Sequence, residues 1–176
     1  LTKKQASPTS PLGTRSNTTP RGSYLEAMSP LTVTLGVQNA SFVAQAVDWI
    51  PESLFQIVTA AFRHRGLSFV RILQRCPEFV GGMFEPWVHD PQRMLMLTHE
   101  NGLKVSPALQ KIYRNQIVHD PADINRAREI ASSEDPIPVG ILYHNPQVPC
   151  YEDLRRAGML RTADTIRTSL DAEFDK

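Results

Sequence analysis

The sequence predicts an α/β fold in which a mostly parallel sheet carries helices on both faces. A strand, a helix and a second strand follow one another within residues 41–73, which is the spacing of a βαβ unit with parallel strands. Apolar residues occupy both faces of the second strand, as expected for a sheet covered on both sides. A later apolar run over residues 138–143 predicts another buried strand.

Composition narrows the class of protein. The 176 residues are 41% apolar, which is enough for one domain or slightly more. The net charge of +1 argues against a nucleic-acid surface, which needs clustered positive charge. No apolar run reaches the roughly 20 residues of a membrane span, and no secretory signal is visible. Only two cysteines occur, which favours a reducing, cytoplasmic compartment.

The chain divides into three predicted parts, residues 1–40, 41–148 and 149–176. It begins with Leu1 rather than Met, so we expect a processed or truncated start. Residues 1–30 contain four prolines that forbid a long regular element. Two interpretations of this segment are open: a disordered tail, or an ordered loop wrapped around a ligand or a partner subunit.

The βαβ unit is predicted from its boundaries. Ser41 to Val47 and Leu67 to Leu73 have the apolar content of strands. Pro51 suits the first turn of the helix between them, and Gly66 suits its end. Apolar residues recur at helical spacing inside this helix: Leu54, Phe55, Val58, Ala61 and Phe62.

Later elements follow weaker signals. Ser106-Pro107 and Asp120-Pro121 each pair a capping residue with a proline, which predicts two helix starts. Pro138 to Tyr143 is the buried strand already noted. Tyr151 to Phe174 is charged and is predicted to be helical at best, packing on a partner or on the outside of the domain.

Cys76 is the main candidate for site chemistry. It comes three residues after the second strand, and ligands of open parallel sheets bind beyond the carboxyl ends of strands. The guanidinium of Arg75 would favour the thiolate that metal ligation needs. The alternative is a buried structural cysteine, because no second cysteine stands at a short metal-binding spacing.

Residues 1–11 are similar to a segment of β subunits in the 2-oxoacid:ferredoxin oxidoreductase family, in which the pattern runs approximately Tyr-Gly-Leu-Thr-Lys/Gly-Gly-Gln-x-Ser-Pro-Thr. The resemblance continues in order along most of the chain. The matching segments are residues 18–22, 29–31, 35–36, 41–44, 69–77, 140–146 and 151–154. The chain therefore resembles the C-terminal portion of such a subunit.

The resemblance implies a thiamine-diphosphate-binding fold that is incomplete without an N-terminal half. The family holds thiamine diphosphate through a divalent metal, usually Mg²⁺, whose ligands would lie upstream of Leu1. It also holds a 4Fe–4S cluster on four cysteines. Cys76 matches the fourth, while the other three belong to the missing half. Thr2 is implied in binding the diphosphate region of the cofactor.

The resemblance also implies substrate residues. Leu1 and Lys3 match positions that line the 2-oxoacid pocket. The ammonium of Lys3 would suit the second carboxylate of 2-oxoglutarate, whereas members that use pyruvate tend to have Gly there. Lys3 could instead be solvated on a mobile loop. Lys4 departs from the family's usual Gly, which leaves the local turn geometry in question.

The implied enzyme is one subunit of a hetero-oligomer with an α subunit. It would convert 2-oxoglutarate and coenzyme A to an acyl-CoA with loss of CO₂, or run in reverse. Electrons would pass through the 4Fe–4S cluster to ferredoxin. Pyruvate or a branched-chain 2-oxoacid is the alternative substrate. A non-catalytic module for subunit assembly is the alternative of another class.

The histidines receive weaker predictions. His64 is expected to interact with a helix dipole, and His89 and His119 to belong to turns or caps beside Asp-Pro. His99 is unassigned, and His144 is a weak site candidate just after a strand. The aromatic residues after Cys76 would either shield a cluster or serve ordinary packing: Phe79, Phe84 and Trp87. Cys150 is expected near the surface.

Overall fold

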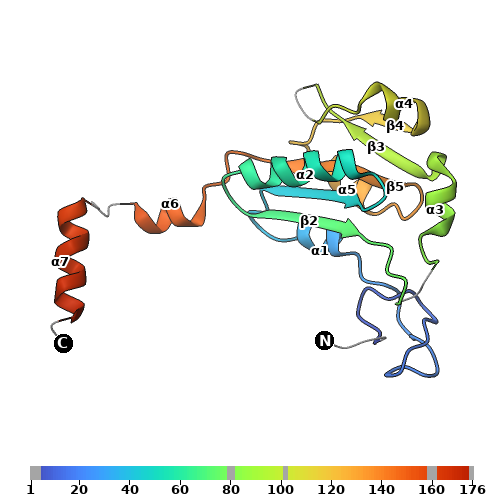
Figure 1. Cartoon of the computed structure of the whole chain (residues 1–176), viewed down its shortest axis with the longest axis horizontal. Coiled ribbons are helices and arrows are strands. Elements are labelled where there is room, and N and C mark those ends of the chain that lie inside the picture. Colours follow the sequence, from blue (N-terminus) through green and yellow to red (C-terminus); the bar gives the residue numbers. More distant parts are fainter. Residues whose placement is uncertain (1–4, 79–81, 101–102, 158–161, 175–176) are drawn as a thin grey trace.

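The computed structural model describes residues 5–78, 82–100, 103–157 and 162–174. The elements are α1 (Pro30–Leu35), β1 (Phe42–Val47), α2 (Pro51–Arg63), β2 (Ser68–Leu73), α3 (Glu85–His89), η1 (Pro91–Arg93), β3 (Met94–Thr98), α4 (Pro107–Ile112), β4 (Gln116–Val118), α5 (Ile124–Ala131), β5 (Ile137–His144), α6 (Tyr151–Arg156) and α7 (Ala163–Phe174). Within these residues the strands form one five-stranded sheet, in the order β2-β1-β5-β3-β4 (Figure 1).

The sheet is mostly parallel, as predicted. β2 pairs with β1, β3 with β5, and β4 with β3 in parallel, whereas β1 and β5 are antiparallel. β1 and β2 therefore run opposite to the other three strands, as the arrowheads in Figure 1 show. The carboxyl ends of β1 and β2 consequently lie at one edge of the sheet, across the strand ends, and those of β3, β4 and β5 lie at the opposite edge.

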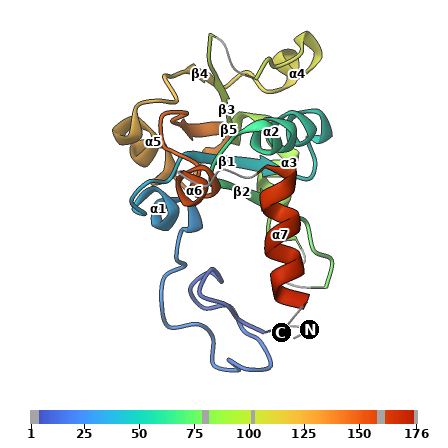
Figure 2. The same cartoon turned by 90° about the vertical axis from the view of Figure 1, so that its left-hand side faces the viewer.

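Helices cover both faces of the sheet, which confirms the predicted α/β class (Figure 2). α2 packs on one face, and α1 and α5 pack on the other. The core under α2 contains Phe42, Ala44, Ala46, Val47, Ile50, Ile57, Leu73, Met94, Met96, Tyr113, Ile137, Val139 and Ile141. The core under α1 and α5 contains Leu31, Leu35, Ala40, Val43, Leu97, Ala127, Ile130, Ala131, Leu142 and Tyr143.

The predicted βαβ unit is present as β1, α2 and β2. Its two strands are parallel, with Phe42 opposite Ser68 and Val47 opposite Leu73. Helices contact both faces of the second strand, as expected, but they cover it incompletely. β2 is an edge strand, so Ile72 stays 46% exposed even though α1 and α2 both reach the strand.

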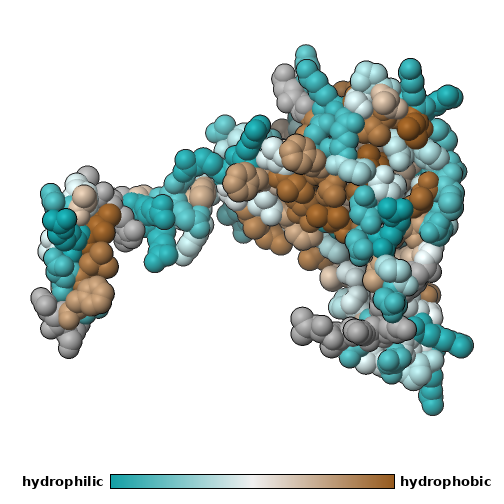
Figure 3. Space-filling view, in the orientation of Figure 1, coloured by the Kyte–Doolittle hydropathy of each residue, from teal (hydrophilic) through white to brown (hydrophobic). Residues whose placement is uncertain are grey.

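α2 has an apolar outer side as well as an apolar inner side. Ile57 is fully buried, and Leu54 packs against the same core. Phe55, Val58 and Phe62 point outward at helical spacing, and Phe62 is 89% exposed. Figure 3 shows apolar side chains gathered over α2 and along one side of α7.

The two predicted helix starts have different outcomes. Ser106 caps α4 by accepting a hydrogen bond from the Leu109 amide, as predicted. α5 begins three residues later than Asp120-Pro121 implied. Asp123 is its N-cap and accepts from the amides of Asn125 and Arg126, because Asp120 instead accepts from the Ala122 amide in the preceding turn.

β3 and β4 extend the sheet beyond the strands that the sequence predicts. β3 lies against β5, where Leu97 approaches Gly140 closely. Gly140 has a φ of +140°, and a Cβ added there would lie 2.8 Å from the Cβ of Leu97. Glycine is required at this position by both the backbone conformation and the lack of space.

The two ends of the chain differ in how they contact the domain. Residues 5–29 form an ordered loop held by its own hydrogen bonds, including Gly13 N to Ser23 O at 2.8 Å and Met28 N to Pro8 O at 2.8 Å. α6 and α7 bury none of their side chains and extend away from the sheet (Figure 1). Among the described residues, no helix is long and apolar enough to cross a membrane.

Candidate functional site

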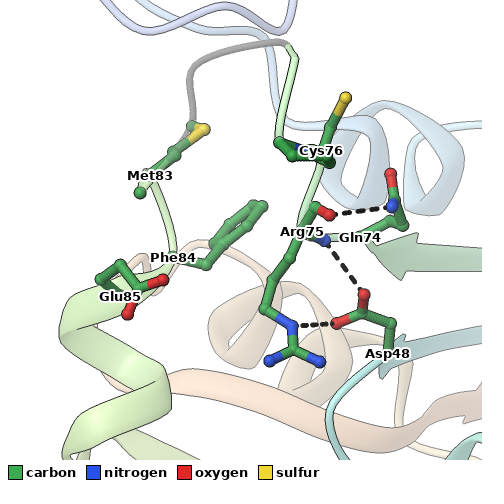
Figure 4. Close-up of a pocket in the computed structure, with 9 residues that line it drawn as sticks. Asp48, Gln74, Arg75, Cys76, Met83, Phe84 and Glu85 are labelled. Atoms are coloured by element: carbon green, nitrogen blue, oxygen red, sulfur yellow. Dashed lines mark hydrogen bonds and ion pairs between the residues drawn. The ribbon is translucent and has the colours of Figure 1, made fainter.

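Cys76 lies beyond the carboxyl edge of the β1–β2 pair. β1 is followed by Asp48 and β2 by Gln74, Arg75 and Cys76, and the Asp48 amide donates to the Leu73 carbonyl at 3.0 Å. Because these two strands are parallel, their following residues meet at one edge. The thiol is partly buried and lines a cavity of about 460 Å³ (Figure 4).

An ion pair fixes the turn that carries Cys76. Asp48 Oδ1 accepts from Arg75 Nε at 2.9 Å, and Asp48 Oδ2 accepts from the Arg75 amide at 3.1 Å. The guanidinium also lies 5.8 Å from the ring centre of Trp49. Figure 4 shows the Cys76 sulfur pointing away from this pair. The charge of Arg75 is therefore paired with Asp48, and its effect on the thiol stays a prediction.

Apolar groups form the opposite wall of the Cys76 cavity. Met83 and Phe84 lie across from Cys76 in Figure 4. Phe84 also packs on the rings of Trp49 and Trp87, at centroid distances of 5.7 and 6.2 Å. Phe84 thus lines the cavity and packs against Trp87, as expected for ordinary packing, while the shielding of a cluster stays a prediction. Phe79 lies outside the described residues.

The ordered loop at the start of the chain lies near this cavity. A second cavity of about 500 Å³ is lined by Thr9, Pro11 and Leu12 of the loop, and Met83 and Phe84 line it as well. The two cavities share these walls, so the loop and Cys76 lie on the same side of the molecule. The predicted site residues Leu1, Thr2 and Lys3 lie outside the described residues.

Cys76 is a single candidate ligand within the described part of the chain. No group of three or more His, Cys, Asp or Glu side chains in that part is placed to hold a metal ion. The other cysteine, Cys150, precedes α6, where its thiol donates to Glu152 Oε2 at 2.9 Å. An environment with one partly buried sulfur and apolar walls fits the edge of a cluster site whose remaining ligands come from elsewhere.

The sequence reasoning missed a second cluster of functional groups, at the opposite edge of the sheet. His64, His99, His119 and His144 all line one cavity of about 1000 Å³. His99 follows β3 and His119 follows β4, so their convergence could be seen only once those two strands were known. His119 is 8% exposed and bonds to β5, which contradicts its predicted role in a turn or cap.

Comparisons with known proteins agree on one class. The family of the C-terminal region of the pyruvate ferredoxin oxidoreductase beta subunit matches residues 109–157. The 2-oxoglutarate oxidoreductase subunit KorB of Mycobacterium tuberculosis is 31% identical over 89% of this chain and 48% of its own length. The 2-oxoacid:ferredoxin oxidoreductase subunit beta of a Sulfolobus species is 27% identical over 89% of this chain and 48% of its own length.

A solved structure extends the agreement to the fold. The 2-oxoglutarate:ferredoxin oxidoreductase of Magnetococcus marinus, with 2-oxoglutarate, coenzyme A and succinyl-CoA bound, has a TM-score of 0.65 and 25% identity. The match covers 96% of this chain and 53% of that one. The fold and the relatives define the class as subunits of 2-oxoacid oxidoreductases.

Within this class, the chain matches the C-terminal portion of 2-oxoacid:ferredoxin oxidoreductase β subunits. It spans about half the length of the curated relatives that it matches. The resemblance found in the sequence is therefore confirmed.

Proposed function

We propose that this chain is the C-terminal portion of the β subunit of a 2-oxoglutarate:ferredoxin oxidoreductase, active in a hetero-oligomer with an α subunit. The reaction would be oxidative decarboxylation of the 2-oxoacid to an acyl-CoA, or its reverse. The observation that carries the proposal is the position of Cys76, partly buried beyond β2 in a cavity that shares Met83 and Phe84 with the cavity lined by the opening loop. The names of several relatives support the choice of substrate.

Cys76 would supply one thiolate to a 4Fe–4S cluster. When bound, such a cluster carries single electrons, and here the acceptor would be ferredoxin. The residues around Cys76 suit this role. The Asp48–Arg75 pair fixes the turn, and Met83 and Phe84 restrict the access of water to the sulfur side of the cavity. Burial and apolar neighbours are the features that tune the potential of a cluster.

The opening loop would complete the substrate and cofactor site. In this proposal Thr2 contacts the diphosphate of thiamine diphosphate, whose Mg²⁺ is bound by residues outside this chain. Leu1 and Lys3 border the 2-oxoacid, with the Lys3 ammonium pairing with the distal carboxylate. The described part of the loop supports this because residues 5–29 are ordered and form one wall of the cavity next to Cys76. The proposed location is cytoplasmic.

The ligand role of Cys76 is tested by comparing Cys76→Ser with Cys150→Ser in the full-length β subunit, assembled with its α subunit under anaerobic conditions. Cys150 is a matched control because it lies before α6, at the start of the tail. We expect Cys76→Ser to lower the iron content and to change the visible absorbance and the electron spin resonance of the cluster. Cys150→Ser should leave all three unchanged. Identical spectra for both variants would refute the assignment.

Substrate choice is tested by Lys3→Gly in the same complex. If Lys3 binds the distal carboxylate, 2-oxoglutarate turnover should fall by at least about tenfold while pyruvate turnover is unaffected, since a tenfold loss corresponds to about 1.4 kcal/mol. Equal effects on both substrates would contradict the proposal and favour pyruvate or a branched-chain 2-oxoacid.

A role in subunit assembly is the second candidate function. It is favoured by α7, which exposes Ile166, Leu170 and Phe174 at helical spacing along one side. If the tail serves assembly, a chain that lacks residues 149–176 should keep its fold but no longer co-purify with the α subunit, and a truncated chain that still assembles would refute this role.

A further inference from the structure

The largest of the cavities described above lies at the carboxyl edge of β3, β4 and β5, away from Cys76. Each strand contributes a histidine at or just after its end: His99, His119 and His144. At this edge β5 meets the first residue of the oppositely directed β1, with His144 paired to Phe42. Crevices beyond strand ends, where the direction of the sheet changes, are the usual ligand sites of open α/β sheets.

The inner histidine pair has ring nitrogens without hydrogen-bond partners. His99 and His119 pack edge to face, with ring centroids 5.1 Å apart. His119 Nε2 lies 2.9 Å from the Ile141 carbonyl, and because a carbonyl can only accept, this nitrogen carries the proton. His119 Nδ1 and both ring nitrogens of His99 are buried and make no hydrogen bond of standard geometry among the described residues, although the His119 backbone interacts with His99 and opposes the lowering of its pKa. Buried polar atoms of this kind require a ligand or an ordered water.

The outer pair, His64 and His144, forms a chain of hydrogen bonds with Ser41 in which each donor can be assigned. Ser41 Oγ donates to the Leu67 carbonyl at 3.0 Å, so it accepts from His64 Nε2 at 2.9 Å. His64 Nδ1 is then an acceptor for His144 Nε2 at 3.2 Å. Ser41 is 1% exposed and its hydroxyl proton is engaged, so this chain of bonds cannot act as a nucleophilic triad.

The charged groups around the cavity leave positive charge available at its rim. α2 contributes Arg63, for which the described residues provide no ion pair, and Arg65 follows α2 and pairs with Asp153 of α6 at 2.7 Å. Glu100 and Asp120 are the acidic lining residues, beside His99 and His119. Burial, and then the charge of His144, lower the pKa of His64, while burial and then His119 lower the pKa of His99. Burial also lowers the pKa of His144.

We propose that this cavity binds a small ligand with an oxyanion group, a carboxylate or a phosphate, that is held by the His99–His119 pair and Arg63. The apolar body of the ligand would lie against the apolar side chains of the lining, Phe42, Leu103 and Ile141. Once they carry protons, the imidazoles of His99 and His119 supply positive charge in the cavity wall, and Arg63 supplies charge-assisted donors to the oxyanion. This cavity shares no lining residue with the Cys76 cavity.

Binding is coupled to proton uptake. The empty cavity disfavours imidazolium because His64, His99 and His144 are close together and buried, whereas the oxyanion favours it. If binding takes up one proton, the affinity for the oxyanion should fall about tenfold for each pH unit above the pKa values of the histidines in the empty cavity.

The test uses the full chain, with benzoate and phenyl phosphate as probes that share a ring and differ in the oxyanion. Histidine C2-proton resonances are followed by NMR at pH values of about 5.5, 6.5 and 7.5, spanning the ordinary histidine pKa, with inorganic phosphate as the probe that lacks the ring. We expect saturable shifts of His99 and His119, tighter binding at lower pH, and weaker binding of inorganic phosphate. Preference for benzoate or for phenyl phosphate identifies the oxyanion. Shifts that never saturate, or that affect His89 equally, would overturn the proposal.

Substitutions locate the site. His99→Gln and Arg63→Ala should each weaken binding of the preferred probe by at least about tenfold, the loss of one charge-assisted contact. His89→Gln is the matched control because His89 is exposed on α3 and pairs with Glu85. Arg63 is exposed, so its variant folds even if His99→Gln does not. Unchanged affinity in Arg63→Ala, together with unchanged resonances of His99 in the parent chain, would refute the site.

Discussion

Gly140 shows how one residue constrains two strands. It lies inside β5 at a φ of +140°, opposite Gln45 of β1 and close to Leu97 of β3. A side chain at this position would be strained by the backbone and would also collide with Leu97. Both effects act on the centre of the sheet, so the position should be among the least tolerant in the chain.

Gly140→Ala should lower the free energy of unfolding by about 3 kcal/mol, combining backbone strain with overpacking. Gly13→Ala is the control, because Gly13 also has positive φ, at +78°, but has nothing within 4 Å of an added Cβ. It should cost only about 1 kcal/mol. Urea unfolding monitored by circular dichroism measures both, and equal losses would show that the contact with Leu97 is unimportant.

The histidines at the opposite edge predict how stability depends on pH. Burial lowers the pKa values of His64, His99 and His144 below the ordinary value of 6.5. The unfolded chain therefore binds protons more readily than the folded one. Stability is fully present above about pH 6.5 and is lost as the pH falls through the lowered pKa values.

His144→Gln should reduce this loss of stability between about pH 7.5 and 5.5, since one of the three protonation sites is removed. The measurement is urea unfolding at both pH values, in the parent chain and in the variant. His89→Gln, on the exposed side of α3, should keep the slope of the parent chain. A parent chain whose stability rises on acidification would contradict the assignment.

At the scale of elements, α5 illustrates why helix boundaries are hard to predict. The sequence predicts a helix start at Asp120-Pro121, whereas the structure has Asp123 as the N-cap. The Pro121 carbonyl accepts from the His144 amide at 2.8 Å, which ties the earlier turn to the end of β5. The first turn of the helix then has to start after this attachment.

Asp123→Ala should destabilise the chain by about 1 kcal/mol, because the amides of Asn125 and Arg126 lose their acceptor. Asp120→Ala removes one turn contact to Ala122 and should cost less than about 0.5 kcal/mol. Thermal unfolding of the two variants under identical conditions makes the comparison. A larger loss of stability in Asp120→Ala than in Asp123→Ala would show that Asp120 is the functional cap.

The strands differ in how well the sequence predicts them. Strong signals exist for β1, β2 and β5, whose apolar runs are bounded by proline, glycine or a helix start. β3 and β4 span only five and three residues. Short strands depend on pairing with neighbours distant in sequence, so their existence is a tertiary property. The histidine cavity was missed for the same reason.

Cys76 was accessible to sequence reasoning because its location depends on one local unit. The βαβ signal fixes the end of β2, and the cysteine follows directly. The orientation of Arg75 was not accessible, since it depends on Asp48, 27 residues earlier on the neighbouring strand. Side-chain partners across strands require the register, which periodicity alone does not provide.

At the scale of the whole molecule, the domain is independent of its tail. α6 and α7 bury no side chain, and Arg65 with Asp153 forms an exposed ion pair between α6 and the domain. Exposed pairs of this kind contribute about 0–1 kcal/mol. The tail is therefore positioned by weak contacts and does not pack on the outside of the domain, contrary to one of the two expectations, while packing on a partner stays a prediction.

Ending the chain at residue 148 should leave the free energy of unfolding within about 0.5 kcal/mol of the parent value, since exposed segments add little to stability. Asp153→Asn should instead raise protease sensitivity around residues 151–156 without changing domain stability. Limited proteolysis with mass spectrometry, alongside urea unfolding, measures both effects. A large loss of stability on truncation would show that the tail is packed.

The antiparallel pairing of β1 with β5 gives the molecule two chemically distinct poles. A sheet with all strands in one direction concentrates its reactive loops at a single rim, where ligands compete for space. Here the cavity at one pole is lined by the Cys76 thiol and apolar side chains, and the cavity at the other pole is lined by histidines. Molecules can therefore occupy both poles at once, and damage to one need not disable the other.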